Sequence, residues 1–264
     1  MNRLAKTAVL LIGLMVSLTA AGRAFAAHPL ITDDAGTQGK GKTQLEFIGE
    51  YGTEKKDGIT EKSLEVPTTP FLSYGLSDTM DLVFGLPYAS VKVEDAGTVT
   101  AARGTTDLSI ELKARVFEKD GLSLAVKPGV SLPTGDEEKG LGNGKTSYST
   151  FFIATREAEP WAFHVNIGYM RNEYKLQTDE KANRKDIWHV SIASQLEVVS
   201  NLTVVANIGM ERNPDRAEDT DPAFALAGFI YSLADNIDID LGIKKALSKP
   251  ETDTAVLAGI TWRL

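Results

Sequence analysis

The sequence predicts an all-β protein, a transmembrane antiparallel up-and-down β-barrel of about twelve strands. Three observations support this fold class. Apolar and polar residues alternate with a period of two over long stretches, the connections between these stretches are alternately short and long, and residues 1–26 have the form of a secretory signal. A period of two is that of a strand, whose successive side chains lie on opposite faces. We therefore expect an exported barrel with apolar residues facing lipid and polar residues facing a lumen.

The clearest alternation lies between Asp107 and Pro133, where two regular runs are separated by the polar turn Glu118–Gly121. This pattern predicts a hairpin of two strands, each of about ten residues or more. Such strands are roughly twice as long as usual in soluble proteins and close to the length that crosses a membrane at a tilt.

The remaining strands are predicted from the same alternation on both sides of this hairpin. They cover Thr43–Thr53, Ser63–Tyr74, Met80–Val93, Lys145–Thr155, Trp161–Arg171, Ile187–Glu197, Leu202–Glu211, Ala223–Ser232, Ile237–Lys245 and Thr254–Leu264. The longer polar connections are Glu54–Lys62, Glu94–Arg103, Thr134–Gly144, Asn172–Asp186, Arg212–Pro222 and Leu247–Asp253. Because outer-membrane barrels have short periplasmic turns and longer outer loops, we expect both termini on the periplasmic side.

The first 26 residues are predicted to be a signal peptide. Arg3 and Lys6 precede an apolar run, and Ala24–Ala26 has the small-x-small pattern that predicts cleavage before Ala27. The chain has no cysteine, which excludes a disulfide scaffold and a lipoprotein anchor. Loss of three cations with the signal changes the formal charge from −8 to about −11, which argues against nucleic acid as a partner.

Residues 27–42 are rich in glycine and show no period. They are expected to form an N-terminal arm or plug, or a flexible terminus, and we slightly favour the flexible terminus. Residues 43–264 would form the barrel itself.

The polar faces of the predicted strands carry many charged and amide side chains. Burial in a dry core would cost roughly several kcal/mol for each charge, whereas a wet lumen accommodates them, so the barrel is favoured over a soluble β-sandwich. Aromatic residues near the tips of the apolar faces, such as Trp161, Tyr169 and Trp188, fit the girdles of a membrane barrel. The candidate lumen-lining residues are Glu111, Lys113, Arg115, Lys127, His164, Asn166, His189, Glu197, Asn207, Glu211, Asp238, Asp240 and Lys244.

Several motifs suggest other chemistry. Gly140–Ser147 resembles a phosphate loop but has Lys139 where the first glycine is needed, and a strand follows it instead of a helix. His189 and Ser191 share a strand face, as in some outer-membrane lipid hydrolases, but they are expected to face the lumen and no oxyanion donor is identified. His164 and His189 lack further ligands at metal-binding spacing, so we expect no metal, no cofactor and no catalytic residue.

Acidic runs in two predicted outer loops, Asp136–Glu138 and Glu218-Asp219, could hold divalent cations together with lipopolysaccharide, although such runs are more often simply solvated.

Three prolines are predicted to meet on adjacent strands. Pro67 and Pro70 lie roughly opposite Pro87 if the intervening turn is near Asp78. Proline cannot donate to a β-ladder and marks bulges or edges. The three residues therefore predict a weakened part of the wall, either a bulge that bends it or a lateral opening through which an apolar solute leaves the lumen.

Several segments resemble a family of outer-membrane proteins assigned to the meta-pathway of phenol degradation. They are HPLITDDAGTQGKGKTQLE, GLSDTMDLVFGLPY, WAFHVNIGY, LAGITWRL and, most specifically, VSLPTGDEEKGLGNGKTSY. The resemblance covers nearly the whole chain after the signal. It implies a barrel in the Gram-negative outer membrane and uptake of aromatic or other hydrophobic compounds. The chain ends in Leu264, where outer-membrane proteins usually have phenylalanine.

From residues and resemblance together, we expect a channel for passive uptake of a small-molecule solute. Its other partners would be outer-membrane lipid, lipopolysaccharide and the barrel assembly machinery. The alternatives are a structural barrel without an open pore and a lipid hydrolase that uses His189 and Ser191.

Overall fold

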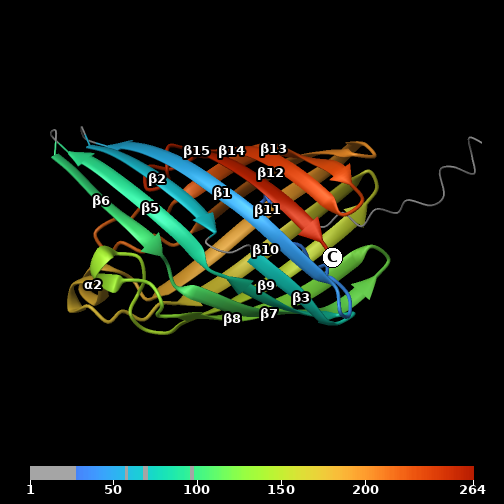
Figure 1. Cartoon of the computed structure of the whole chain (residues 1–264), viewed down its shortest axis with the longest axis horizontal. Coiled ribbons are helices and arrows are strands. Elements are labelled where there is room, and N and C mark those ends of the chain that lie inside the picture. The colour runs from blue at the N-terminus through green and yellow to red at the C-terminus, as the bar shows by residue number, and fades with distance from the viewer. Residues whose placement is uncertain (1–27, 57–58, 68–70, 96–97) are drawn as a thin grey trace, which may run out of the picture.

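The computed structural model describes residues 28–56, 59–67, 71–95 and 98–264. Its strands form one antiparallel sheet that closes on itself where β15 pairs with β1 (Figure 1). The strands are β1 (Thr43–Lys56), β2 (Ile59–Pro67), β3 (Phe71–Ser77), β4 (Met80–Gly85), β5 (Pro87–Asp95), β6 (Thr98–Thr105), β7 (Leu108–Lys119), β8 (Leu122–Leu132), β9 (Ser147–Ala158), β10 (Trp161–Arg171), β11 (Asp186–Val199), β12 (Leu202–Glu211), β13 (Ala223–Ala234), β14 (Ile237–Ala246) and β15 (Thr254–Arg263). The 3-10 helix η2 (Glu137–Lys139) and the helix α2 (Gln177–Ala182) lie in loops, and no helix in these ranges is long and apolar enough to cross a membrane.

Three strands of the wall are interrupted. β2 and β3, β4 and β5, and β6 and β7 are each the two parts of one strand, so that the 15 segments make a closed barrel of 12 strands. This confirms the predicted fold class and strand number. The interruptions lie on neighbouring strands, whereas β1 on one side and β8 on the other are continuous.

Two of the predicted outer loops are wrong. Polarity alone predicts loops at 54–62 and 94–103, but β1 and β2, and likewise β5 and β6, continue as paired strands through most of these segments. Both segments contain β-branched residues, which favour strands. They form tall hairpins at the end of the barrel that carries α2 (Figure 1). In the part of the chain that the structure describes, β6 pairs with β5 on one edge and with no strand on the other.

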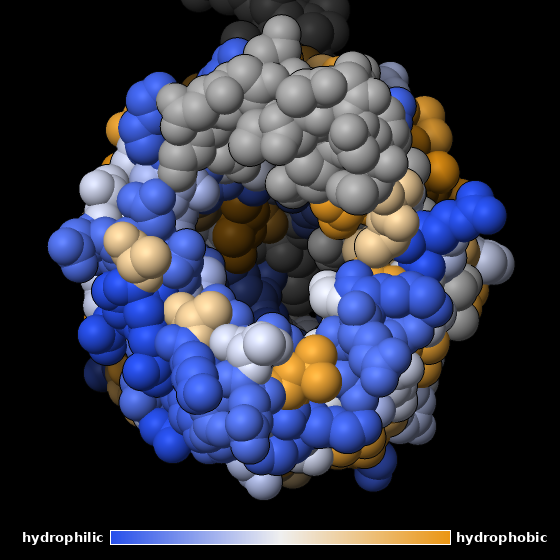
Figure 2. All heavy atoms as spheres, turned by 90° about the vertical axis from the view of Figure 1, so that its left-hand side faces the viewer, coloured by the Kyte–Doolittle hydropathy of each residue, from blue (hydrophilic) through white to orange (hydrophobic). Residues whose placement is uncertain are grey.

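The two faces of the wall differ as the alternation predicts. On β10, Phe163, Ile167 and Tyr169 point outward and are 41–55% exposed, whereas His164 and Asn166 point inward and are 0–2% exposed. An apolar outer surface of this kind is solvated by lipid in a membrane barrel. Figure 2, a view of the end with the long loops, shows a central hollow with a largely hydrophilic rim.

The ends of the barrel wall meet at the short-turn end. The backbone N–H groups of Thr43 and Leu264 each donate to the carbonyl of the other residue, at 3.1 and 2.8 Å. Residues 28–42, which precede β1, therefore join the wall at this end of the barrel.

Candidate functional site: the lumen and its N-terminal arm

The segment 28–42, here called the arm, lies inside the barrel. Thr32, Asp34, Ala35 and Thr37 are at most 4% exposed. The arm has no regular secondary structure, so its backbone polar groups need partners from the wall. The slight preference for a flexible terminus is wrong, because hydrogen bonds and ion pairs hold this segment along its length. A composition rich in glycine gave no indication of these contacts.

Ion pairs anchor the middle of the arm to two neighbouring strands. The Asp33 carboxylate lies 2.9 Å from Lys113 Nζ on β7 and 2.8 Å from Lys127 Nζ on β8. Lys113 also lies 3.6 Å from Asp34, and Lys127 lies 3.4 Å from Glu111. Burial raises the pKa of Asp33, but the two ammonium groups outweigh this effect and hold its pKa well below the usual value. The anchor therefore persists through mildly acidic pH.

Amide side chains of the wall bind the arm backbone. Asn207 Oδ1 accepts hydrogen bonds from the N–H groups of Ile31 and Thr32 at 2.8 and 3.0 Å, and Asn207 Nδ2 donates to Thr32 Oγ1 at 2.7 Å. The side-chain oxygen of Asn166 accepts a hydrogen bond from the N–H of Asp33 at 2.7 Å, and its side-chain nitrogen donates one to the carbonyl of Asp33 at 2.9 Å. These contacts replace the hydrogen bonds that water would make to a buried extended chain.

The two ends of the arm contact different strands of the wall. Near the short-turn end, the N–H of Gln38 donates to both carboxylate oxygens of Asp81, at 2.9 and 3.1 Å. At the other end of the arm, His28 Nδ1 lies 2.5 Å from Asp240 Oδ1 on β14. The arm thus crosses the lumen and reduces its cross-section.

The predicted lumen-lining residues fall into two groups. Those that contact the arm directly are Lys113, Lys127, Asn166, Asn207 and Asp240. The others make contacts within the wall, or are exposed at its rim. His164 Nδ1 lies 3.0 Å from Thr155 Oγ1, which accepts from the N–H of Ala35.

Four of the remaining charged residues form ion pairs with wall or loop residues. These pairs are Arg115 with Glu118, Asp238 with Arg263, and Lys244 with Glu50 and Glu251, while Glu111 binds Lys127. Glu197 is exposed beside the β-bulge at the end of β11. The interior is consequently a network of largely compensated charges.

One part of the inner wall is apolar, which the alternation did not predict. Six buried residues form a cluster on β12, β13 and β15, against which Leu30 of the arm packs. They are Val205, Phe224, Leu226, Ile230, Ala255 and Leu257. The sequence of β13, AFALAGFIYSLA, is apolar on both faces and so carries no alternation from which an inner face could be assigned.

The pair considered for hydrolysis does form a hydrogen bond. His189 Nε2 lies 3.0 Å from Ser191 Oγ, and His189 Nδ1 lies 3.4 Å from Glu211 Oε2. However, Ser191 is 2% exposed and points into the lumen from the middle of a paired strand, where its neighbours' N–H groups serve the β-ladder. This arrangement suits a structural polar contact better than attack on a lipid ester. In the described ranges, no group of three or more histidine or acidic side chains is arranged to bind a metal ion.

The prolines lie where the wall is interrupted. Pro67 at the end of β2 pairs in register with Pro87 at the start of β5, as the sequence predicts, while Pro70 lies outside the described residues. The break between β6 and β7 is at the same level, because the N–H of Thr106 donates to the carbonyl of Pro87 at 2.9 Å. We call this line of interruptions across β2/β3, β4/β5 and β6/β7 the seam.

The loop that follows β8 covers the seam next to β6. Asp107 accepts hydrogen bonds from the N–H groups of Gly135 and Asn143, both at 2.9 Å, and Leu141 is 5% exposed. A Cβ atom at Gly142 would lie 2.3 Å from Asp107 Oδ1, so this close approach requires glycine. The glycines of the phosphate-loop-like motif therefore shape an outer loop.

A cavity of about 340 Å³ lies between the arm and the strands at the seam. Its lining includes the charged residues of the anchor together with an apolar group on the arm and the wall. The apolar residues are Leu30, Ile31, Ile48, Phe71 and Val83. Phe71 is the first residue of β3, and its ring lies over Gly85, the last residue of β4. The cavity thus reaches the inner side of the seam.

Comparisons with known proteins agree with this architecture. A family model described as "Putative MetA-pathway of phenol degradation" matches residues 32–264. An outer membrane channel from Pseudomonas putida F1 has a TM-score of 0.65 at 12% identity, over 85% of this chain and 96% of that chain. The NanC porin has a TM-score of 0.56 at 12% identity, over 83% and 100% of the two chains, and the KdgM porin 0.50 at 7%, over 83% and 98%. Curated proteins give no match. At such identities these structures support the barrel fold alone.

Proposed function

Since the chain belongs to the family described as "Putative MetA-pathway of phenol degradation", we propose that this outer-membrane barrel is a channel for the passive uptake of small hydrophobic or aromatic molecules. Catalysis has no part in the proposal. Selectivity would come from the shape and polarity of the space that the arm leaves open.

The cavity behind the seam is the observation that carries the proposal. Its volume of about 340 Å³ is that of a small-molecule site, and three of its apolar residues, Ile48, Phe71 and Val83, lie on β1, β3 and β4 at the seam. Apart from the apolar cluster on β12, β13 and β15, against which Leu30 packs, the rest of the interior consists largely of compensated charges, which favour water over an apolar solute. For an aromatic molecule that enters from the outer end, transfer from water into the lumen would therefore be most favourable along this side.

The seam offers a way out for such a solute. In the described ladder, β1 changes its partner on the seam side, from β3 up to Glu46 to β2 from Glu50. Among the described strands β6 pairs with β5 alone, so fewer backbone hydrogen bonds must break at the seam than in an uninterrupted wall. The lateral opening at Pro67, Pro70 and Pro87 is proposed on this basis, with passage along the arm to the periplasmic end as the other route.

Filling the cavity tests this route. Ile48→Trp places a large side chain in the cavity, and we expect uptake of phenol or benzoate into proteoliposomes to fall several-fold. Ile260→Trp is the matched control, because Ile260 is 47% exposed on the outer face of the adjacent strand β15. Equal uptake by the two variants would contradict a route through this cavity.

The two alternatives make different predictions. A structural barrel without an open pore would show no single-channel conductance in planar bilayers and no solute-dependent swelling of liposomes. A lipid hydrolase would lose turnover of phospholipid in the Ser191→Ala variant. We expect this variant to take up solute like the unmodified protein, because Ser191 contacts His189 away from the cavity.

A further inference from the structure

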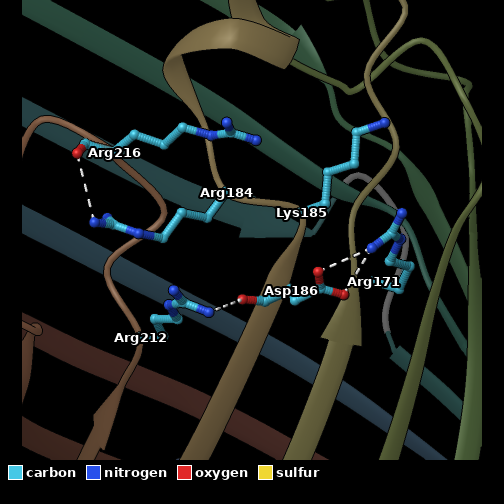
Figure 3. A pocket seen from close by; sticks show the side chains of 6 residues that line it. All are labelled: Arg171, Arg184, Lys185, Asp186, Arg212 and Arg216. Carbon is cyan, nitrogen blue, oxygen red and sulfur yellow. Dashed lines mark hydrogen bonds and ion pairs between the residues drawn. The ribbon is translucent and has the colours of Figure 1, made fainter.

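A depression of about 510 Å³ at the outer end of the barrel is lined mainly by cations. It lies between the loop that joins β10 to β11 and the loop that joins β12 to β13 (Figure 3). Its lining residues are Arg171, Arg184, Lys185, Asp186, Arg212 and Arg216. This cluster could not be predicted from the sequence, because its members come from two loops that are separated by the hairpin of β11 and β12. In a chain with a formal charge of −8, such a concentration of cations needs an explanation.

The base of this depression faces away from the lumen. Along β10, the outward residues Phe163, Ile167 and Tyr169 are exposed, and Arg171 continues their row. Asp186 precedes the outward Trp188 on β11, and Arg212 follows the outward Met210 of β12. A solute inside the channel would therefore not meet these side chains.

The cluster also has a defined height on the wall. Tyr169 pairs in register with Trp188, and Arg171 pairs with Asp186 one level further out. The N–H of Arg212 donates to the carbonyl of Trp188 at 2.9 Å, which places Arg212 beside Trp188, where β12 ends and the loop begins. Because Tyr and Trp mark the interface of a membrane, the cations beside and immediately beyond them lie at the level of the lipid headgroups.

The two loops are firmly joined, so the depression is a built feature. Arg184 Nη1 donates to the carbonyls of Asn213 and Glu218, both at 3.1 Å, and also to that of Asp215. The N–H of Arg184 donates to the carbonyl of Pro214 at 2.7 Å. Through these contacts Arg184 serves the scaffold and is not available to a ligand.

Carboxylates compensate some of the cations but not all. Arg171 binds both oxygens of Asp186 at 2.8 and 2.9 Å, and Lys185 binds Glu173 and Glu180 at 2.9 and 2.7 Å. Hydrogen bonds from Lys185 and Arg171 hold the pKa of Glu173 below its usual value, so this carboxylate stays charged and stays paired.

Arg212 and Arg216 are the cations left over. Both are exposed, and within the described ranges neither forms an ion pair with a carboxylate. Arg212 Nη1 lies 3.5 Å from the carbonyl of Asp186, and Arg216 Nε donates to the carbonyl of Asn183 at 2.8 Å, so most of their N–H donors are unused.

We propose that Arg212 and Arg216 bind a phosphate group of a phosphorylated lipid of the outer leaflet, of the lipid A type, whose acyl chains lie against the apolar outer face of β10, β11 and β12. Guanidinium groups match phosphate oxygens in geometry and charge, and such charge-assisted hydrogen bonds are stronger than neutral ones. The apolar residues directly below the cluster provide the surface for the acyl chains. This site is independent of the transport route.

Binding of lipid A to the purified barrel in detergent tests the proposal. Native mass spectrometry would compare the unmodified protein, the R212A/R216A variant and K245A as matched control. Lys245 is an exposed outward cation near the loop end of β14 that does not line the depression, and its partner in the structure is Thr254. We expect R212A/R216A to bind bis-phosphorylated lipid A about tenfold more weakly, and K245A to bind it like the unmodified protein.

A second measurement needs no variant. The unmodified protein is titrated with bis-phosphorylated, mono-phosphorylated and dephosphorylated lipid A, and with inorganic phosphate as competitor. We expect affinity to fall with each phosphate removed, and millimolar phosphate to compete poorly because it lacks the acyl chains. Equal binding of the dephosphorylated lipid, or unchanged binding by R212A/R216A, would overturn the proposal. If inorganic phosphate displaced the lipid completely, the depression would be a general anion site, and the proposal that it binds a lipid would be overturned.

Discussion

Removal of residues 28–42 will raise the single-channel conductance of the barrel several-fold. The arm crosses the lumen between Asp81 near the short-turn end and Asp240 on β14, and its middle is buried against the wall. Without it, the ion-paired interior becomes a wider water-filled path, as expected for a barrel of this strand number. Removal also frees Lys113 and Lys127 from Asp33, so we expect the current to shift toward anions. Conductance and reversal potential in planar bilayers measure both effects.

The shortened protein should still fold, which makes this experiment decisive. Closure of the barrel depends on β1, which starts at Thr43, and its pairing with β15 runs without a bulge from Gln44 to Thr53. Heat-modifiable migration on a gel will show whether the barrel has formed. If a folded barrel without the arm conducts like the full chain, the arm is not the constriction and the proposed selectivity must come from elsewhere.

The second large effect is expected from Lys113→Ala. This substitution leaves Asp33 with Lys127 alone and removes the ion pair of Asp34, whose side chain is 5% exposed. Loss of one partner of a buried ion pair destabilises a structure by about 3 kcal/mol or more, because the remaining charge is buried without compensation. Here the loss would act on the arm and not on the barrel wall. Hydrogen exchange at the N–H groups of Ile31, Thr32 and Gln38 should become roughly a hundredfold faster.

Lys244→Ala is the control for this experiment. Lys244 is an equally buried lysine of the lumen, but it binds Glu50 and Glu251 and not the arm. Its replacement should leave exchange in the arm unchanged. Equal acceleration in both variants would mean that any loss of lumen charge loosens the arm, and that the anchor at Asp33 has no special role.

The wall could be predicted from the sequence wherever one face is apolar and the other polar. The run WAFHVNIGYMR gives β10 with both faces assigned, and the prolines located the seam through the pairing of Pro67 with Pro87. In β13, where apolar residues occupy both faces, the inner apolar cluster left no periodic signal. The segments 54–62 and 94–103 were predicted as loops because they are polar. Polarity indicates exposure to solvent, and a strand that extends beyond the membrane is as exposed to solvent as a loop.

The contents of the lumen could not be predicted in the same way. The arm has no period, and its position depends on contacts such as that of Thr32 with Asn207, 175 residues away in the chain. The outer basic depression likewise depends on the packing of two loops. Composition showed which residues were polar, but only the fold shows which of them are left without a partner.

The free edge of β6 limits how deeply the barrel sits in the bilayer. Among the described residues this strand pairs on one side only, and unpaired backbone N–H and C=O groups are not tolerated in the hydrocarbon layer. On this flank the acyl-chain region must therefore stop at or below the end of β6 near Thr105, which is the height of the seam. A molecule that leaves sideways would then emerge at the boundary between headgroups and acyl chains, where amphiphilic rings partition most readily.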